Sequence, residues 1–259
     1  MKFTSIARMT CGLVLSTACC AIAAAETIAD THIRDGLAAE AQLDTPRALA
    51  AFIAADKAKP DDAFILQKIA RHYSDSIVDL PADQLPEKKR RAELALKYSK
   101  RAVALNPDNA ENVLSLAVCH GTLAIYSDTR TKIKYSRLVK EEAERALALN
   151  PDYDWGHHLL GRWHYEVASL GATTRFFVRV IYGGLPDASV EKAVEHLERA
   201  VALAPAVAPH HLELGFAYLA ADRSADARAA FNRGLALPSA GKHDEAAKTR
   251  AREALKALD

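Results

Sequence analysis

Cysteine is scarce in this sequence, and most of the cysteines lie near the N-terminus. Three of the four cysteines fall within the first 25 residues, which leaves Cys119 alone in the remainder. A chain that loses those residues therefore has no intramolecular disulfide. Cys119 lies among apolar residues at helical spacing, which indicates a buried and unreactive thiol rather than a nucleophile.

The sequence also lacks an excess of either positive or negative charge. The 259 residues carry 34 basic and 33 acidic side chains, and removing Lys2 and Arg8 leaves 32 basic ones. This balance gives no electrostatic basis for binding nucleic acid or an anionic membrane surface. The content of 50% hydrophobic and 26% charged residues is that of an ordinary globular protein with a real core.

The motifs of common catalytic and cofactor sites are absent from the sequence. It contains no Gly-x-Ser-x-Gly, no Gly-x-Gly-x-x-Gly after a strand, no Cys-x-x-Cys and no His-Glu-x-x-His. Residues 234–242 end in Gly-Lys, but His243 stands where a phosphate loop needs Ser or Thr. We therefore expect no enzyme activity and no cofactor.

A group of histidines raises the question of a metal site. The group falls in two neighbouring repeats and consists of His157, His158, His164, His210 and His211. Adjacent residues point to different sides of a helix, and no cysteine ligand accompanies them. We expect these histidines to replace core residues and to bind no metal.

Long apolar runs are missing except at the N-terminus. Lys2 and Arg8 precede a charge-free run from Met9 to Ala25 that ends in three alanines. This layout predicts a signal peptide over residues 1–25, cleaved after Ala25, and a protein exported to the periplasm. A retained membrane anchor, or a lipid attached at Cys19, are the alternatives.

The rest of the chain repeats one pattern four times. Small residues recur seven apart, and a proline follows five residues after the second of each pair. The pairs are Ala48/Ala55, Ala95/Ala102, Val139/Ala146 and Ala193/Ala200, and the prolines are Pro60, Pro107, Pro151 and Pro205. Each copy predicts a helix with a small-residue packing face that ends before a proline.

A second pattern follows each proline. It reads Leu66-x-x-Ile69-Ala70-x-x-Tyr73, and its counterparts begin at Val113, His157 and His211. Spacings of three and four put these positions on one stripe of a helix, and the central Ala or Gly lets another helix approach closely. Alternation of the two patterns predicts paired helices that stack on one another.

These residues resemble the tetratricopeptide repeat, whose helix pairs end in proline. The resemblance implies an all-α fold of antiparallel helix pairs stacked in a right-handed solenoid. Successive prolines are 47, 44 and 54 residues apart, where the ordinary repeat has 34, so we expect inserted loops between the helices of the middle repeats. The expected domain covers 26–259, with repeats at 29–60, 61–107, 108–151, 152–205 and 206–238 and a capping helix at 242–259 whose outer face meets water.

The middle of the chain also resembles the regulator of microtubule dynamics family. The resemblance runs from residue 95 to 258 and is most specific at Leu160-Gly161-Arg162-Trp163, with Gly183-Gly184-Leu185-Pro186 behind it. Eukaryotic members are associated with microtubules or organelle membranes, and one branch has a repeat domain that takes up phospholipid. For an exported chain, the resemblance implies the fold and a binding groove but not the cellular role.

In such stacks the first helix of each pair lines a concave groove. The repeat register places on this groove Phe64, Gln67, Arg71, Glu111, Leu114, Val118, Trp155, His158, Arg162, Tyr165, Leu212, Phe216 and Leu219. Some related grooves grip the terminal carboxylate of a peptide with Lys and Asn at set positions. Other residue types occupy those positions here. We expect a protein or peptide partner in the groove, with an apolar small molecule such as a phospholipid as the alternative.

The insert at 173–186 contains the most apolar run outside the leader, from Phe176 to Tyr182. An exposed patch of this size is uncommon, so we expect a short helix folded over the repeat core. The alternatives are a lid over the groove or a segment that touches a membrane, with Arg175 and Arg179 meeting phosphates.

Overall fold

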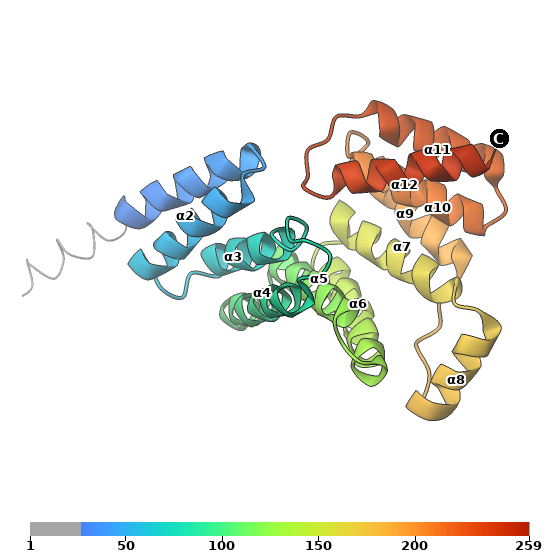
Figure 1. The fold of residues 1–259 in the computed structure, drawn as a ribbon, viewed down its shortest axis with the longest axis horizontal. Helices are drawn as coiled ribbons and strands as arrows, with labels where there is room; N and C mark the ends of the chain where they lie inside the picture. The colour runs from blue at the N-terminus through green and yellow to red at the C-terminus, as the bar shows by residue number, and fades with distance from the viewer. Residues whose placement is uncertain (1–26, 259) are drawn as a thin grey trace, which may run out of the picture.

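The computed structural model describes residues 27–258, and the expected leader at 1–25 lies outside them (Figure 1). The regular secondary structure of the described residues is entirely helical, which confirms the all-α expectation. The helices are residues 27–41, α2 (Thr45–Ala58), α3 (Ala63–Asp75), α4 (Leu85–Leu105), α5 (Ala110–Ile125), α6 (Thr129–Leu149), α7 (Asp154–Ala168), α8 (Ala172–Tyr182), α9 (Val190–Leu203), α10 (Ala208–Ala220), α11 (Ser224–Ala236) and α12 (Asp244–Ala257).

The second helices end where the repeated prolines predict. The last residue before the proline has a non-helical backbone in each case, with φ −134° at Lys59, −140° at Asn106, −141° at Asn150 and −137° at Ala204. A following proline disfavours helical geometry at these positions. Polar caps begin the next helices, because Asp62 and Asn109 accept hydrogen bonds from backbone N–H groups of the first turn.

The helices form antiparallel pairs that stack in sequence order. The pairs are 27–41 with α2, α3 with α4, α5 with α6, α7 with α9, and α10 with α11. The first helices also contact one another along a single row of α3, α5, α7, α10 and α12, which we call the inner row. The second helices pack mainly on first helices, so the inner row is the shared inner layer.

Small residues set the spacing between the paired helices. Ala48, Ala102 and Ala200 have no exposed surface. A Cβ built on Gly215 would lie 2.4 Å from Cε1 of Phe231, and one built on Gly36 would lie 2.8 Å from the Phe52 ring. The first and last repeats therefore use the same pairing of a glycine with a phenylalanine ring, which larger side chains would disrupt.

Extra residues in the middle repeats do not all form loops, which corrects one expectation. In the repeat at 108–151, only residues 126–128 separate two long helices of 16 and 21 residues. The added length extends the helices, because the sequence from Thr129 to Leu149 contains no proline or glycine to stop them. The repeat at 61–107 does have a loop at 76–84, and α4 then starts at Leu85 beside Pro86.

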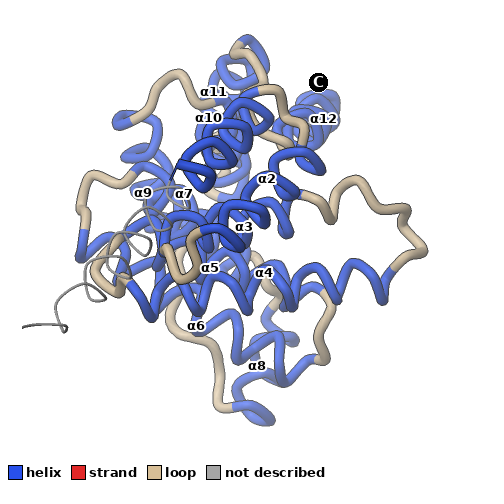
Figure 2. Tube along the Cα trace, turned by 90° about the vertical axis from the view of Figure 1, so that its left-hand side faces the viewer, coloured by secondary structure: helices blue, strands red, loops and turns tan. Residues whose placement is uncertain are grey.

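Helix α8 does not cover the repeat core, so that expectation is wrong. None of its residues is buried, and both views show it projecting away from the stacked pairs (Figures 1 and 2). The core contact is made instead by the chain after α8, where Leu185 and Ala188 pack against Trp163 and Val167. Within residues 27–258, no helix combines the length and apolar character needed to cross a bilayer.

Candidate functional site

The inner row carries the residues that the repeat register assigns to the groove, but they differ in accessibility. Phe64, Glu111, Arg71, Val118, Trp155 and Arg162 are exposed, and Tyr165, Phe216 and Leu219 are half-buried. Gln67, Leu114, His158 and Leu212 are buried, with at most 8% of their surface exposed. Those four side chains pack inside the stack and offer little surface to a ligand.

Trp155 lies on the inner row with its ring held by two histidines. Its ring centroid is 5.0 Å from that of His158 and 4.8 Å from that of His210, and 40% of the residue is exposed. His210 Nε2 donates to Asp154 Oδ2 at 2.9 Å, which leaves its Nδ1 to accept from His158 Nδ1 at 3.0 Å. This series of hydrogen-bonded side chains links α7 to α10 and fixes the indole ring, part of which stays exposed to solvent.

Both histidines are held in the neutral form. Burial lowers the pKa of His158 well below its usual value, and the neighbouring His210 and Arg162 add to that effect. Burial also lowers the pKa of His210, although the Asp154 carboxylate opposes the shift. Neutral rings can donate through one nitrogen and accept through the other, as this hydrogen-bonded chain requires.

Two arginines lie beside the aromatic side chains of α7 and α10. Arg162 donates to Glu166 at 2.8 Å, and 45% of its side chain is exposed. Arg250 of α12 lies 4.5 Å from the Phe216 ring centroid and 3.3 Å from the buried carboxylate of Glu213. We call the surface of Trp155, Arg162, Tyr165, Phe216 and Arg250 the aromatic face.

Sequence reasoning missed Arg250 and Glu213. The sequence places Arg250 on the water-facing side of the capping helix, because it is one of the charged residues that alternate with an apolar stripe there. A signal was present: a charged residue between Leu212 and Leu214 on a first helix needs a partner of opposite sign when buried. The structure supplies that partner from α12, which occupies the next place in the inner row.

The opposite end of the inner row is closed by charged side chains. Glu40 lies 2.8 Å from Arg71 and 3.1 Å from Lys68, with the buried ring of His72 at 3.6 Å. Burial alone would raise the pKa of Glu40, but His72, Arg71 and Lys68 together lower it to about 2. Arg71 is therefore engaged by this carboxylate and is not a free cation of the groove.

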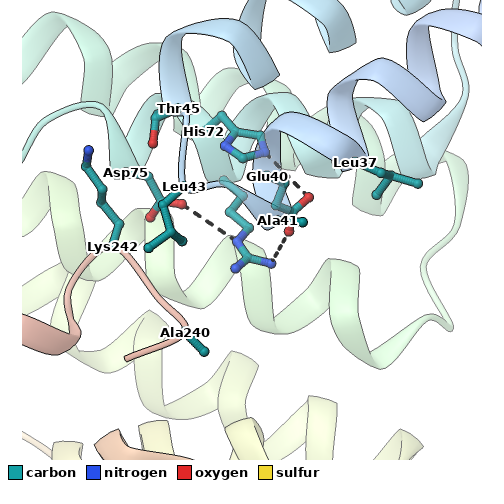
Figure 3. Close-up of a pocket in the computed structure, with 10 residues that line it drawn as sticks. Leu37, Glu40, Ala41, Leu43, Thr45, His72, Asp75, Ala240 and Lys242 are labelled. Atoms are coloured by element: carbon teal, nitrogen blue, oxygen red, sulfur yellow. Dashed lines mark ion pairs between the residues drawn. The ribbon is translucent and has the colours of Figure 1, made fainter. Parts of the chain in front are cut away.

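A loop from the C-terminal end reaches these N-terminal repeats. Lys242 Nζ lies 2.8 Å from Asp79 Oδ1, and His243 Nε2 lies 3.1 Å from Asp75 Oδ1. Beneath this loop is a cavity of about 290 Å³, lined by residues of 27–41 and α3 together with Ala240 and Lys242 (Figure 3). The solenoid therefore curves until its two ends meet.

Two charged side chains of α12 hold this loop, which corrects the expectation that the charged residues of the cap meet water. Asp244 accepts hydrogen bonds from the backbone N–H groups of Ala240 and Gly241, both at 2.9 Å. Lys248 donates to the Leu237 carbonyl at 2.6 Å. Both charged side chains are buried because they satisfy loop backbone groups that would otherwise lose their hydrogen bonds to water.

His157 and His211 have structural partners. His157 Nε2 lies 2.9 Å from the Pro151 carbonyl and His211 Nε2 lies 2.9 Å from the Pro205 carbonyl, so both close the turn that ends the preceding helix. His157 Nδ1 lies 3.0 Å from His196 Nδ1. Among the described residues, no group of three or more potential ligands is arranged to hold a metal ion.

Cys119 lies on α5 and is buried against Ser74 of α3. Burial raises the pKa of its thiol to about 11, so the thiolate is disfavoured at neutral pH. This position fits the structural thiol that the sequence predicts.

Solved structures of low sequence identity share this fold. A thermophilic TPR protein of Thermus thermophilus is 21% identical with a TM-score of 0.63, covering 88% of this chain and 99% of that one. The pilF protein of Pseudomonas aeruginosa is 14% identical with a TM-score of 0.52, covering 90% and 86% respectively. They show that the chain has the tetratricopeptide-repeat fold.

Comparison with sequence families gives a more specific result. Regulator of microtubule dynamics protein 1 of Bos taurus is 31% identical over 145 residues, 56% of this chain and 45% of that protein. Protein 2 of Homo sapiens is 28% identical over 188 residues, 72% of this chain and again 45% of the relative. The chain thus matches less than half the length of these relatives. The family model for regulator of microtubule dynamics proteins 1-3 matches residues 31–259, and the chain belongs to this family.

Proposed function

We propose that this protein is a non-catalytic scaffold that binds a protein segment on the aromatic face of its inner row. The observation that carries the proposal is the grouping of three accessible aromatic rings with two arginines on α7, α10 and α12. Aromatic residues and arginine are the residue types enriched where proteins bind one another.

The aromatic face is ordered before any ligand arrives. Trp155 is held by His158 and His210, and the rings of Tyr165 and Phe216 lie 6.5 Å apart. Side chains that are already fixed lose less conformational entropy on binding. The ion pairs of both arginines leave donors available, because each guanidinium carries five N–H groups. A segment with apolar side chains and a carboxylate fits this surface.

A peptide library displayed on phage, selected against the full chain, tests the proposal. Selected peptides should bind the wild type and lose at least about tenfold in affinity to Trp155→Ala, the cost expected at a central aromatic contact. Arg233→Ala on α11 changes an exposed arginine of a second helix and serves as the matched control. Equal loss in both variants, or no loss in Trp155→Ala, would contradict the assignment.

The alternative ligand is a phospholipid or another apolar small molecule. The cavity of about 290 Å³ is smaller than the roughly 300–1,000 Å³ of pockets that enclose drug-sized ligands, and it lies beside Glu40 and Lys242 rather than at the aromatic face, so it does not supply a lipid site there. Native mass spectrometry of the purified protein separates the two. A mass that includes a co-purified lipid would support the carrier function, and an unliganded mass supports the scaffold.

Export is a further part of the proposal and rests on the sequence of residues 1–25. N-terminal sequencing of the secreted protein should give Glu26 as its first residue. A start at Cys19 or at Met1 would contradict export by cleavage after Ala25. Contact with a membrane through 173–186 is a separate proposal, because α8 lies outside the inner row.

A further inference from the structure

Helix α8 presents apolar side chains to solvent on one face. Phe176, Phe177, Val180 and Ile181 are 62%, 54%, 65% and 59% exposed. Their spacing of one, four and five residues places them together on the helix surface. We call these four residues the α8 face. Contiguous exposed apolar side chains of this kind mark an interaction surface.

Hydrogen bonds at its two ends, rather than a buried core, fix α8 in this exposed position. Arg175 donates to the Ala168 carbonyl at 3.1 Å before the helix. Arg137 of α6 donates to the carbonyls of Tyr182 and Gly184 after it, at 2.7 and 2.5 Å. Gly183 and Gly184 both have positive φ, 76° and 84°, which makes the turn that returns the chain to α9 possible.

The surroundings of the α8 face are strongly basic, although the chain as a whole is balanced. Residues 130–140 of α6 include five basic residues and no acidic one, and α8 itself has two arginines and no acid. Arg130, Lys134 and Arg137 share a hollow of about 400 Å³ with Ile181 and Tyr182. The acids nearest in sequence are Asp128 and Glu141, which flank this stretch of α6, and Glu166 and Asp187, which flank α8.

We propose that the α8 face and the basic turns of α6 dock onto an anionic lipid bilayer. The four apolar side chains would enter the boundary between headgroups and acyl chains, and the cations would lie at the level of the phosphates. A helix of 11 residues is roughly 16 Å long, suited to lying in the plane of the interface. A bilayer accommodates the apolar and cationic parts together.

Charge decides between a bilayer and a second copy of the chain. In a symmetric dimer through this face, each copy would place its basic residues against those of the other, and like charges repel. An anionic bilayer attracts the same residues. The proposal therefore predicts that binding depends on lipid charge and weakens with added salt.

Co-sedimentation of the purified chain with vesicles tests the proposal. We expect binding to vesicles of mixed phosphatidylglycerol and phosphatidylcholine, and much weaker binding to phosphatidylcholine alone. Phe177→Asp combined with Ile181→Asp should reduce binding to the mixed vesicles by more than about tenfold, because it removes two apolar contacts and adds two negative charges. Arg130→Gln combined with Lys134→Gln should reduce it by about fivefold for each charge.

Matched variants control for general effects of charge and hydropathy. Leu85→Asp changes a side chain on α4 that is 58% exposed, and Lys97→Gln with Lys100→Gln removes two exposed cations of α4. Both should bind vesicles as the wild type does. The α8 variants should keep the wild-type melting temperature, because no side chain of α8 is buried.

Three results would overturn the proposal. The first is equal binding of the wild type to charged and uncharged vesicles, or no binding to either. The second is wild-type binding by the Phe177→Asp and Ile181→Asp variant. The third is a dimer in sedimentation analysis that this variant converts to a monomer with vesicle binding unchanged, since the α8 face would then be occupied by a second copy.

Discussion

The two ends of the inner row are built from different chemistry on the same repeated backbone. At the N-terminal end, Glu40 gathers Lys68, Arg71 and His72 into a charged cluster. At the C-terminal end, aromatic rings and neutral histidines surround Trp155. Since buried small residues keep the helix pairs stacked at both ends, the inner positions are free to differ. The comparison separates residues that maintain the stack from residues that determine its surface chemistry.

Close packing should give the largest effect, and it differs between the last repeat and the middle of the stack. Gly215→Leu should destabilise the fold by about 3 kcal/mol or more, because even a Cβ there would lie 2.4 Å from the Phe231 ring. Gly121→Ala on α5 is the matched change, since its Cβ would lie 3.6 Å from Val139. It should be neutral or stabilise by up to about 1 kcal/mol. Thermal melts test the pair, and similar destabilisation by both would contradict this packing.

Mild acid should weaken the C-terminal end. Burial, with His196 and nearby lysines, lowers the pKa of His164 to about 4 from the ordinary 6.5. Between those pH values the unfolded chain takes up a proton that the folded chain does not, so stability falls as pH falls, by about 3 kcal/mol at most. Urea unfolding at several pH values should show a smaller decrease for His164→Leu. An unchanged decrease would contradict a contribution from His164.

The N-terminal end should respond to stronger acid. The pKa of Glu40 is about 2 in the folded state and 4.5 ordinarily, so its contribution is present above pH 4.5 and is lost as pH falls toward 2. Glu40→Gln should cost about 2 kcal/mol at neutral pH, because Lys68 and Arg71 lose a charged partner. The stability difference from the wild type should shrink in that acid range, as measured by urea unfolding. A constant difference would contradict the charged cluster.

Arg162→Ala should have the smallest effect on stability. The ion pair with Glu166 is exposed and spans one helical turn, and such pairs contribute about 0.3–0.5 kcal/mol. Peptide affinity should fall far more than the melting temperature, because the arginine lies on the aromatic face. Melting temperature and peptide affinity measured on the same variant test this. A large drop in melting temperature with unchanged affinity would make Arg162 a structural residue instead.

The sequence predicted the helix pairs because local chemistry determines them. Prolines at 60, 107, 151 and 205 each follow the end of a helix, because proline cannot continue one, and small residues at fixed spacing identify the packing face. The partners of Glu213 and Asp75 could not be predicted, because they come from α12 and the loop before it, 37 and 168 residues away. Such contacts depend on the curvature of the whole stack, which no local pattern encodes.

The exposed position of α8 was also beyond sequence reasoning. An apolar run such as Phe176 to Ile181 normally packs on a core, and that rule gave the wrong expectation. Its position depends on the hydrogen bonds from Arg137, which lies 45 residues before Tyr182. We infer an interaction surface on α8 because its apolar side chains are exposed instead of packed on the core.

Hydrogen exchange of the full chain with and without a library-selected peptide tests the central claim most directly. The account predicts that the peptide slows exchange in α7, α10 and α12, whose side chains form the aromatic face, and leaves the outer helices α4, α6 and α11 unchanged. Slower exchange confined to those outer helices would contradict binding on the inner row.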